Sequence, residues 1–260
     1  MINDISIGIV TYKERRLFVR DLINKLRKTF PESIDILLNI NGNNEELMDD
    51  DYRQEMLDLA KTYKNVYPIF CPEFKSLSKL WNTLVIFSKT EYNLILCDDV
   101  NVINKNIYYE LMSTINNKGY DFVTINGEFS HFICTKTILH DIGYFDERLS
   151  AYGFEDMDMH YRYIKKYGKR IENIQISGIY NQALYELKTP NLEVFVANKP
   201  KFSNEVVKLM YTNDPNGIVH PLDSNPIKKI WEDKQQYPHE MYVRNNKHNI
   251  AKFERVILDE

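Results

Sequence analysis

Short apolar runs alternate with helix-like segments along this chain, and that alternation limits its possible folds more than any other feature. Residues 4–11, 34–40, 66–70 and 92–97 are short runs of mainly apolar residues. Helix-like segments follow the first three of them, over residues 17–30, 45–63 and 76–89. Strands that are buried on both faces read as continuous apolar runs. Repeated units of this kind predict an α/β fold with a doubly wound, mainly parallel sheet flanked by helices.

The pattern is less regular in the second half of the chain. We expect a helix over residues 104–117, strands over 120–125, 131–135 and 170–179, and the densest acidic cluster within 145–167. Beyond residue 188 prolines recur and periodicity weakens. The sequence therefore predicts one domain over residues 1–187. Residues 188–260 would form a C-terminal appendage that completes one side of the domain's binding site or mediates association.

Composition limits the class of protein. The chain has 260 residues, of which 43% are hydrophobic, so it can bury a substantial core. Its 33 basic and 37 acidic residues leave a formal charge of −4, which provides no general attraction for nucleic acid. We therefore expect no nucleic-acid partner.

The cysteines and the apolar segments indicate the compartment. Cys71, Cys97 and Cys134 are an odd number without paired spacing, so no disulfide framework is expected. Met1 leads into a charged, strand-like segment, and no apolar stretch approaches the ~20 residues that cross a bilayer. We expect a cytoplasmic protein, which could rest on a membrane surface.

Polar residues follow the predicted strands, at the sheet edge where doubly wound folds bind ligands. Asp98 and Asp99 terminate the apolar strand predicted over residues 92–97. Adjacent buried carboxylates are costly unless a cation compensates them, and their oxygens suit Mg²⁺ or Mn²⁺. The alternative is that one aspartate caps the segment that follows and the other is solvated. From these residues alone, both interpretations stay open.

A second acidic group lies at the predicted start of a helix, in residues 153–158. The helix dipole favours acids in a first turn, and this explains them without any chemistry. Alternatively, one acid is a general base and another positions a hydroxyl group. Asp156 and His160 are four residues apart and could bind a metal, but the spacing favours an ordinary surface pair.

Three segments carry a resemblance to a known family. They are SIGIVTYKER at residues 6–15, LILCDDVNV at 94–102, and IGYFDERLSAYGFEDMDMHYR at 142–162. Together they resemble the family 2 glycosyltransferases of the GT-A fold, in that family's order, over about residues 5–179. The resemblance implies a Rossmann-like GT-A domain. It also implies an inverting transfer of a sugar from a nucleotide-sugar donor, most commonly a UDP-sugar, to an acceptor hydroxyl group.

The resemblance implies a donor pocket with several residues. By position, Thr11, Tyr12 and Glu14 line the nucleotide pocket after the first strand. Asn41 stands where the family often has an aspartate that reads the base. Asn82 matches a polar position near the donor site.

The resemblance also implies a divalent metal, Mn²⁺ or Mg²⁺. Asp98 and Asp99 match the family's Asp-x-Asp region, but Cys97 replaces its first acid. Asp99 is therefore assigned to the metal and Asp98 to the ribose or a second metal contact. His220 is the candidate third ligand, with a surface-loop histidine as the alternative.

The catalytic residues follow from the Glu-Asp pair of the third segment. Asp156 is the expected general base and Glu155 the group that orients the acceptor, a hydroxyl group of a glycan or glycolipid. His131 could instead contact donor or acceptor. In polysaccharide biosynthesis, such a transfer would take place in the cytoplasm or at its membrane.

Two other functions and three uses of the tail stay open at this stage. A metal-dependent nucleotidyltransferase would normally carry a glycine-rich phosphate loop, which this chain lacks after its first predicted strand. A catalytically inactive nucleotide-sugar or carbohydrate-binding protein is the second alternative. Residues 227–256 mix basic and aromatic residues, which would suit a peripheral membrane contact, a homodimer contact or a solvated tail.

Overall fold

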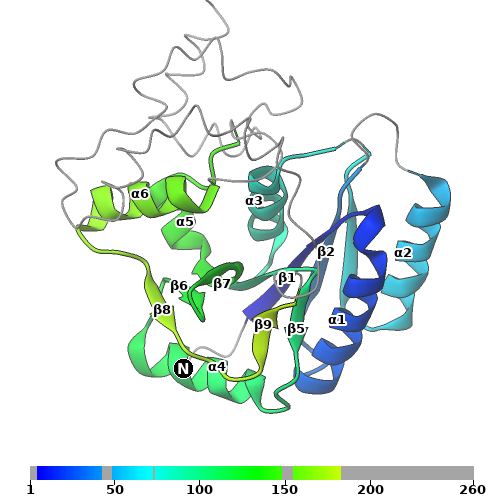
Figure 1. The fold of residues 1–260 in the computed structure, drawn as a ribbon, viewed down its shortest axis with the longest axis horizontal. Helices are drawn as coiled ribbons and strands as arrows, with labels where there is room; N and C mark the ends of the chain where they lie inside the picture. The colour runs from blue at the N-terminus through cyan, green and yellow to red at the C-terminus, as the bar shows by residue number, and fades with distance from the viewer. Residues whose placement is uncertain (1–4, 43–48, 73, 148–154, 183–260) are drawn as a thin grey trace, which may run out of the picture. The chain divides into compact units, whose positions relative to one another are not determined.

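A computed structural model describes residues 5–42, 49–72, 74–147 and 155–182 (Figure 1). These residues belong to two compact units, and we describe each by itself. The first unit contains described residues from 5–74, 83–138 and 172–182. The second contains described residues from 75–82 and 139–171.

The first unit is organised around a seven-stranded sheet. Its strands are β1 (Ile5–Thr11), β2 (Ile36–Ile40), β3 (Val66–Phe70), β4 (Tyr92–Cys97), β6 (Phe122–Ile125), β7 (Glu128–Thr135) and β8 (Glu172–Ile174). Their order is β3-β2-β1-β4-β7-β6-β8, and only β7 runs antiparallel to its neighbours β4 and β6. The mixed α/β class and the mainly parallel sheet are therefore confirmed.

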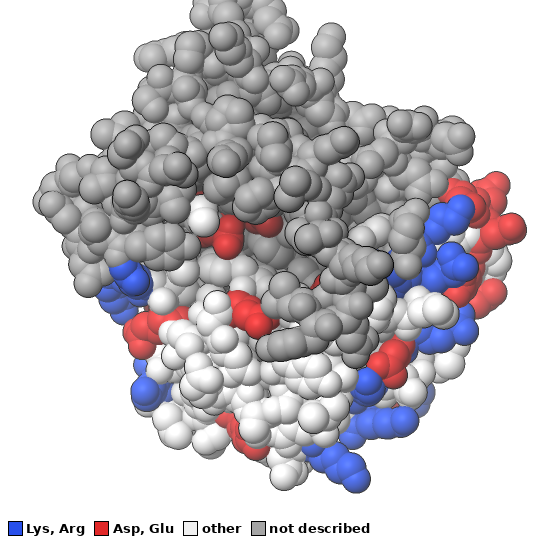
Figure 2. All heavy atoms as spheres, viewed as in Figure 1, with Lys and Arg blue, Asp and Glu red and all other residues white. Residues whose placement is uncertain are grey.

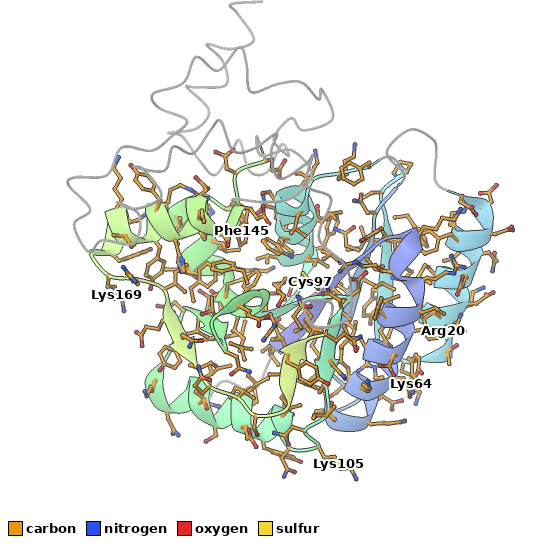
Figure 3. The ribbon with its side chains drawn as sticks, viewed as in Figure 1. Arg20, Lys64, Cys97, Lys105, Phe145 and Lys169 are labelled. Carbon is orange, nitrogen blue, oxygen red and sulfur yellow. The ribbon has the colours of Figure 1, made fainter. Side chains whose placement is uncertain are left out.

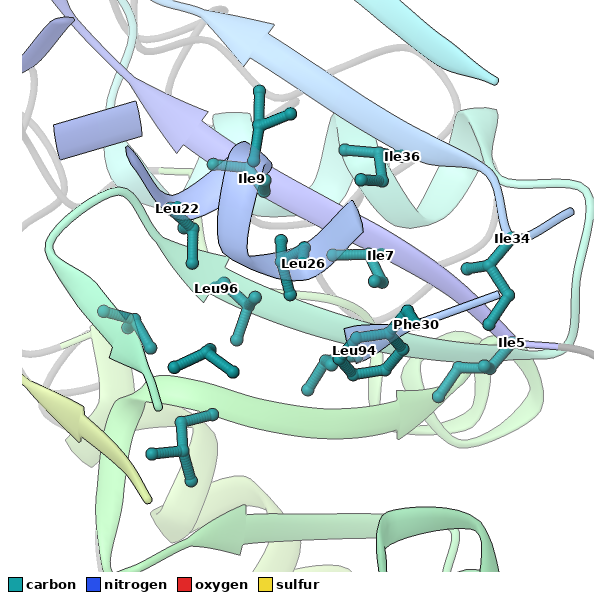
Figure 4. Close-up of a cluster of buried hydrophobic side chains, with 14 of the residues drawn as sticks. Ile5, Ile7, Ile9, Leu22, Leu26, Phe30, Ile34, Ile36, Leu94 and Leu96 are labelled. Carbon is teal, nitrogen blue, oxygen red and sulfur yellow. The ribbon is translucent and has the colours of Figure 1, made fainter. Parts of the chain in front are cut away.

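Helices cover both faces of this sheet. Helices α1 (Arg16–Thr29), α2 (Asp50–Thr62) and α4 (Ile107–Lys118) share one core cluster with alternate strand residues such as Ile7 and Ile9 (Figure 4). Helix α3 (Leu77–Phe87) lies on the opposite face, where a Cβ atom on Gly8 would come within 3.0 Å of Leu84 Cδ1. Burial on both faces explains why these strands are continuously apolar.

The outer surfaces of α1 and α2 carry mixed charge. Arg20 of α1 pairs with Glu55 of α2 at 2.7 Å, and Arg16 approaches the same carboxylate at 3.5 Å. Basic and acidic side chains lie intermixed over these two helices, at the right of Figure 2. Exposed ion pairs of this kind contribute at most about 1 kcal/mol each, so the buried core is the main source of stability here.

The predicted single strand over residues 170–179 is wrong. The chain instead forms β8 and, after a turn, β9 (Ile179–Asn181), which pairs with β5 (Val100–Val102) in a separate two-stranded sheet. Gly178 in the turn has a φ of 72°, a conformation that interrupts a strand. The Asn126 side chain fixes the turn by bonding the N–H and C=O of Ile176, both at 2.9 Å.

The second unit contains the start of α3, the end of α5 (Lys136–Ile142), a turn at residues 143–147 and helix α6 (Glu155–Tyr167). Helix α6 is tied to the end of α5, because Arg162 donates to the Ile142 carbonyl at 3.3 Å and Tyr167 bonds Asp141. Helix α5 was not predicted from the sequence. Helix α2 was predicted to start at residue 45, whereas Asp49 caps the helix by accepting from the Tyr52 N–H at 3.0 Å.

Two further expectations concern cysteines and membranes. The three cysteines, which all lie within the described residues, form no disulfide, as predicted. In the described part of the chain, no helix has the length and apolar character needed to span a bilayer.

Candidate functional site

The carboxyl ends of β1, β2 and β4 bring together three of the predicted site residues in the first unit. These strands are parallel neighbours, with Thr11 beside Ile40 and Val10 beside Cys97 in the register. Thr11 ends β1, Asn41 follows β2, and Asp98 follows β4. The Asn41 N–H donates to the Thr11 carbonyl at 2.8 Å, and both residues are buried. The predicted meeting of polar residues at one sheet edge is thus present.

Asp98 and Asp99 are buried at this edge and share one cation. Arg15, in the short helix η1 (Lys13–Arg15), reaches both carboxylates through its Nη1 atom. That nitrogen lies 3.2 Å from Asp98 Oδ1 and 2.5 Å from Asp99 Oδ2. Arg15 stands within the first of the three sequence segments, but no role was predicted for it. The available signal was a basic residue four positions beyond the end of β1, a strand of this edge.

The electrostatics of this group follow from its burial. Burial raises the pKa of Asp98 to about 7, even though the Arg15 charge opposes the rise. Burial by itself would lower the pKa of Arg15, but the charges of Asp98 and Asp99 raise it above its ordinary value. One guanidinium group therefore compensates two carboxylates incompletely.

The remaining oxygens fit a divalent cation. Asp98 Oδ2 and Asp99 Oδ1 are buried and have no hydrogen-bond partner among the described residues. Hard carboxylate oxygens are the ligands that Mg²⁺ and Mn²⁺ take, often together with phosphate oxygens of a substrate. Within the described ranges, no group of three or more His, Cys, Asp or Glu side chains could hold a metal. The predicted third ligand, His220, lies outside the described residues.

Tyr12 and Glu14 precede Arg15 in the same turn. The Tyr12 side chain is exposed, and its hydroxyl accepts a hydrogen bond from Arg15 Nε at 2.7 Å. Glu14 belongs to η1, but its side chain lies outside the described residues. Cys97, which ends β4 (Figure 3), is partly exposed. The assignment of Thr11, Tyr12, Glu14 and Asn41 to a donor pocket stays a prediction.

His131 is a further buried group of the first unit. In the β4–β7 register it lies opposite Leu96. Leu96 is two residues before Asp98, which follows β4. Ser130 Oγ donates to Glu128 Oε2 at 3.0 Å and lies 2.8 Å from His131 Nδ1. This geometry favours a proton on Nδ1, which leaves Nε2 as an acceptor. Nε2 is buried without a hydrogen-bond partner among the described residues, and burial lowers the pKa of His131 to about 4.

In the second unit, Asn82 clamps the turn at residues 143–147. Its Oδ1 accepts from the Phe145 N–H at 2.9 Å, while its Nδ2 donates to the Phe145 carbonyl at 2.9 Å and to Glu147 Oε1 at 3.0 Å. Trp81 packs against the Phe145 ring with a centroid distance of 4.9 Å. Both N–H groups of the Asn82 amide are used internally. A donor molecule could therefore be contacted only through the second lone pair of Oδ1.

Helix α6 carries the predicted catalytic acids in its first turn. Glu155 is buried and Asp156 is partly exposed. Burial raises the pKa of Asp156, although backbone N–H groups of the helix start oppose the rise. A carboxylate with a raised pKa is a better proton acceptor, so the environment suits a general base. The assignments of Glu155 and Asp156 stay predictions.

Asp158, the next acid of α6, forms a buried ion pair within the helix. Asp158 is fully buried and pairs with Arg162 at 2.6 Å, one helical turn away. The His160 imidazole has its pKa lowered to about 4 by burial, and the Arg170 charge acts in the same direction. A metal on Asp156 and His160 would need further ligands, and the described residues contain no group of three or more candidates.

The comparisons with known proteins bear on the fold. No protein-family model and no curated protein sequence matches the chain. Among solved structures, S. aureus TarS superposes with a TM-score of 0.54 and 15% identity, over 78% of this chain and 44% of TarS. Its fragment 1–349 in complex with UDP gives a TM-score of 0.54 and 16% identity, over 78% of this chain and 73% of the fragment.

A third match covers all of the chain. The mannosyltransferase PcManGT from Pyrobaculum calidifontis, in complex with GDP-Man and Mn²⁺, has a TM-score of 0.61 and 11% identity, over 100% of this chain and 76% of that one. The chain spans less than half of TarS, and all three identities are low. These matches therefore show the fold, which is the mixed α/β fold of GT-A glycosyltransferases.

Proposed function

We propose that this protein is a glycosyltransferase that moves a sugar from a nucleotide-sugar donor to an acceptor hydroxyl group. The observation that carries the proposal is the buried pair of Asp98 and Asp99 at the carboxyl end of β4. Each carboxylate keeps one oxygen without a partner among the described residues. A buried oxygen of this kind is costly unless a ligand binds it. The edge that holds the pair is the one where doubly wound sheets bind nucleotides.

The solved structures of the same fold support the choice of donor. TarS was solved with UDP, and PcManGT with GDP-Man and Mn²⁺. We propose that Thr11, Tyr12 and Asn41 contact the nucleoside, and that Asp98 bonds its ribose. Asp99 would hold a divalent cation, Mn²⁺ or Mg²⁺, which when bound neutralises charge on the departing diphosphate.

Two acids of α6 would then carry out separate parts of the reaction. Asp156 accepts the proton of the acceptor hydroxyl group as its oxygen forms a bond to the anomeric carbon. The bond from that carbon to the diphosphate oxygen breaks with its electron pair, and the configuration inverts. Glu155 orients the acceptor, for which we propose a glycan or glycolipid. Protonation of Asp156 would stop the reaction, so its carboxylate form is the active one.

A screen of nucleotide sugars tests this proposal. The full chain is heated with UDP- and GDP-sugars in the presence and absence of Mn²⁺, because a bound donor raises the melting temperature by mass action. Release of nucleoside diphosphate from the best donor is then measured with and without Mn²⁺. Binding without any release, even with acceptors present, would identify an inactive binding protein. Release of sugar 1-phosphate in place of nucleoside diphosphate would identify a nucleotidyltransferase, because transfer of the nucleotidyl group breaks the bond between the two phosphates.

The partners and compartment belong to the same proposal. Enzymes that extend glycolipids meet their acceptors at a membrane, so we propose a cytoplasmic protein with peripheral membrane contact through residues 227–256, or a homodimer through the same segment. Flotation with anionic liposomes and the molar mass in solution distinguish the two, with a chain truncated after Asp223 as control. Equal flotation of the full and the truncated chain would contradict a membrane contact through residues 227–256.

A further inference from the structure

We propose that Arg15 is a built-in counter-ion that holds the Asp98–Asp99 pair until a nucleoside diphosphate and a divalent cation replace it. The inference rests on the proposed function, because it concerns the same donor site. It adds a role for a residue outside the predicted pocket. Metal binding would then depend on nucleotide binding through the movement of one side chain.

The contact geometry is the first support. A single nitrogen, Nη1, contacts both carboxylates, at 3.2 Å from Asp98 Oδ1 and 2.5 Å from Asp99 Oδ2. A cation that bridges two carboxylates lies where a metal shared by them would also lie. Because like charges repel strongly in a buried site, Arg15 and a divalent cation should exclude each other there.

The charge balance is the second support. Arg15 supplies one positive charge to two carboxylates, and Asp98 Oδ2 and Asp99 Oδ1 remain buried without hydrogen-bond partners among the described residues. A divalent cation in the place of Arg15 would compensate both charges, and the two oxygens without partners show that the carboxylates can still accept further ligands. Arg15 therefore lowers the free-energy cost of burying the two carboxylates but does not remove that cost.

The position of Arg15 allows it to leave. Its side chain is 26% exposed, compared with 3% for Asp98 and 5% for Asp99, so the guanidinium can reach solvent while the acids cannot. Its Nε is bonded to the hydroxyl of exposed Tyr12 at 2.7 Å. A ligand that docks on Tyr12 would therefore meet Arg15 directly. A diphosphate offers the paired oxygens that guanidinium groups bind in bidentate fashion.

Binding of Mn²⁺ to the purified full chain tests the inference without any catalysis. Free Mn²⁺ is followed by its electron paramagnetic resonance signal for wild type, Arg15→Gln, Arg15→Lys and the surface control Arg20→Gln. Without nucleotide, Arg15→Gln should bind Mn²⁺ about tenfold more tightly than wild type. Arg15→Lys should lie between them, because a lysine keeps the positive charge but has a shorter side chain and lacks the Nε that bonds Tyr12. Arg20→Gln should match wild type.

The coupling to nucleotide gives the second readout. In wild type, UDP or GDP should tighten Mn²⁺ binding, within the ~5–150-fold range of typical coupling between two ligands. In Arg15→Gln the enhancement should fall about tenfold, since the site is already open to the ion. Circular dichroism establishes that each variant is folded, and Arg15→Lys carries the test if Arg15→Gln is not.

The outcomes separate this inference from the function it rests on. If neither Arg15 variant binds Mn²⁺ more tightly than wild type, while wild type binds Mn²⁺ with UDP, the counter-ion role is wrong and the proposed donor site stands. If no form binds Mn²⁺ with or without nucleotide, the metal part of the proposed function fails and the inference fails with it.

Discussion

The two units differ in how completely their buried acids are paired with cations and hydrogen-bond donors. In the first unit, Asp98 and Asp99 share Arg15, and one oxygen of each has no partner among the described residues. In the second unit, Asp158 is fully buried against Arg162, and Glu147 accepts from Asn82 and lies near Lys79. Matched pairs of the second kind stabilise a local structure, whereas incompletely matched acids retain capacity for a ligand. Burial of an acid is therefore a weaker sign of function than the oxygens it leaves without partners.

The largest expected effect comes from Asp156, the acid of α6 that we propose as the general base. Asp156→Asn should reduce turnover by ~10²–10⁴-fold, the usual contribution of a general base, because an amide cannot accept the proton. Donor affinity, measured by calorimetry with Mn²⁺, should stay near that of wild type. Asp58→Asn, on the exposed surface of α2, serves as the charge-matched control. Loss of donor affinity in Asp156→Asn would instead assign this acid to the donor site.

Asn82 tests the contribution of the compensated acids in the second unit, because it donates to Glu147. Asn82→Ala should lower the free energy of unfolding by about 3–5 kcal/mol, because the N–H and C=O of Phe145 and one Glu147 oxygen would lose a buried partner. Urea unfolding measures the change, and Asn117→Ala on the exposed surface of α4 is the control. A variant of unchanged stability with weakened donor binding would show that Asn82 acts on the donor, as the family resemblance implies.

A smaller effect is expected at Asp158. Asp158→Asn should cost about 2 kcal/mol of stability, because Arg162 keeps a hydrogen-bond acceptor but loses its buried counter-charge. Asp21→Asn removes the charge of an exposed pair with the same four-residue spacing, to Lys25, and should cost less than about 1 kcal/mol. Both are compared by chemical denaturation. Equal costs for the two variants would contradict the distinction between buried and exposed pairs.

Periodicity could predict the strands and the edge where they end, because burial on both faces leaves a continuous apolar run in the sequence. Asn41 and Asp98 were found in this way. The roles of Arg15 and Asn82 could not be found, since the contacts of Arg15 with Asp98 and of Asn82 with Phe145 join residues 83 and 63 positions apart. The strand over residues 170–179 was predicted wrongly because the interruption at Gly178 depends on Asn126, which is distant in sequence.

His131 extends the comparison to a buried histidine, a side chain whose ordinary pKa lies near neutral pH. Burial lowers its pKa to about 4, compared with 6.5 for the unshifted side chain. The unfolded chain therefore takes up this proton at a higher pH than the folded chain. The contribution of neutral His131 to stability is complete above pH 6.5 and is lost as the pH falls toward 4. Between pH 7 and pH 5 the loss should be about 1–2 kcal/mol.

The measurement must be a difference between variants, because other groups titrate in the same range. Burial raises the pKa of Asp98 to about 7, so the folded chain takes up that proton first and the contribution of Asp98 has the opposite sign. In urea unfolding from pH 5 to pH 7, the stability of wild type should therefore not show the full rise expected from His131, because the Asp98 contribution falls with pH over the same range. His131→Gln should remove that contribution, so that its stability relative to wild type improves by about 1–2 kcal/mol at pH 5 compared with pH 7. The same substitution at the exposed His140 is the control for the loss of a histidine. If the stability of His131→Gln instead follows the same pH dependence as wild type, the imidazole is solvated. His131 would then not count among the buried groups of the first unit that lack a partner.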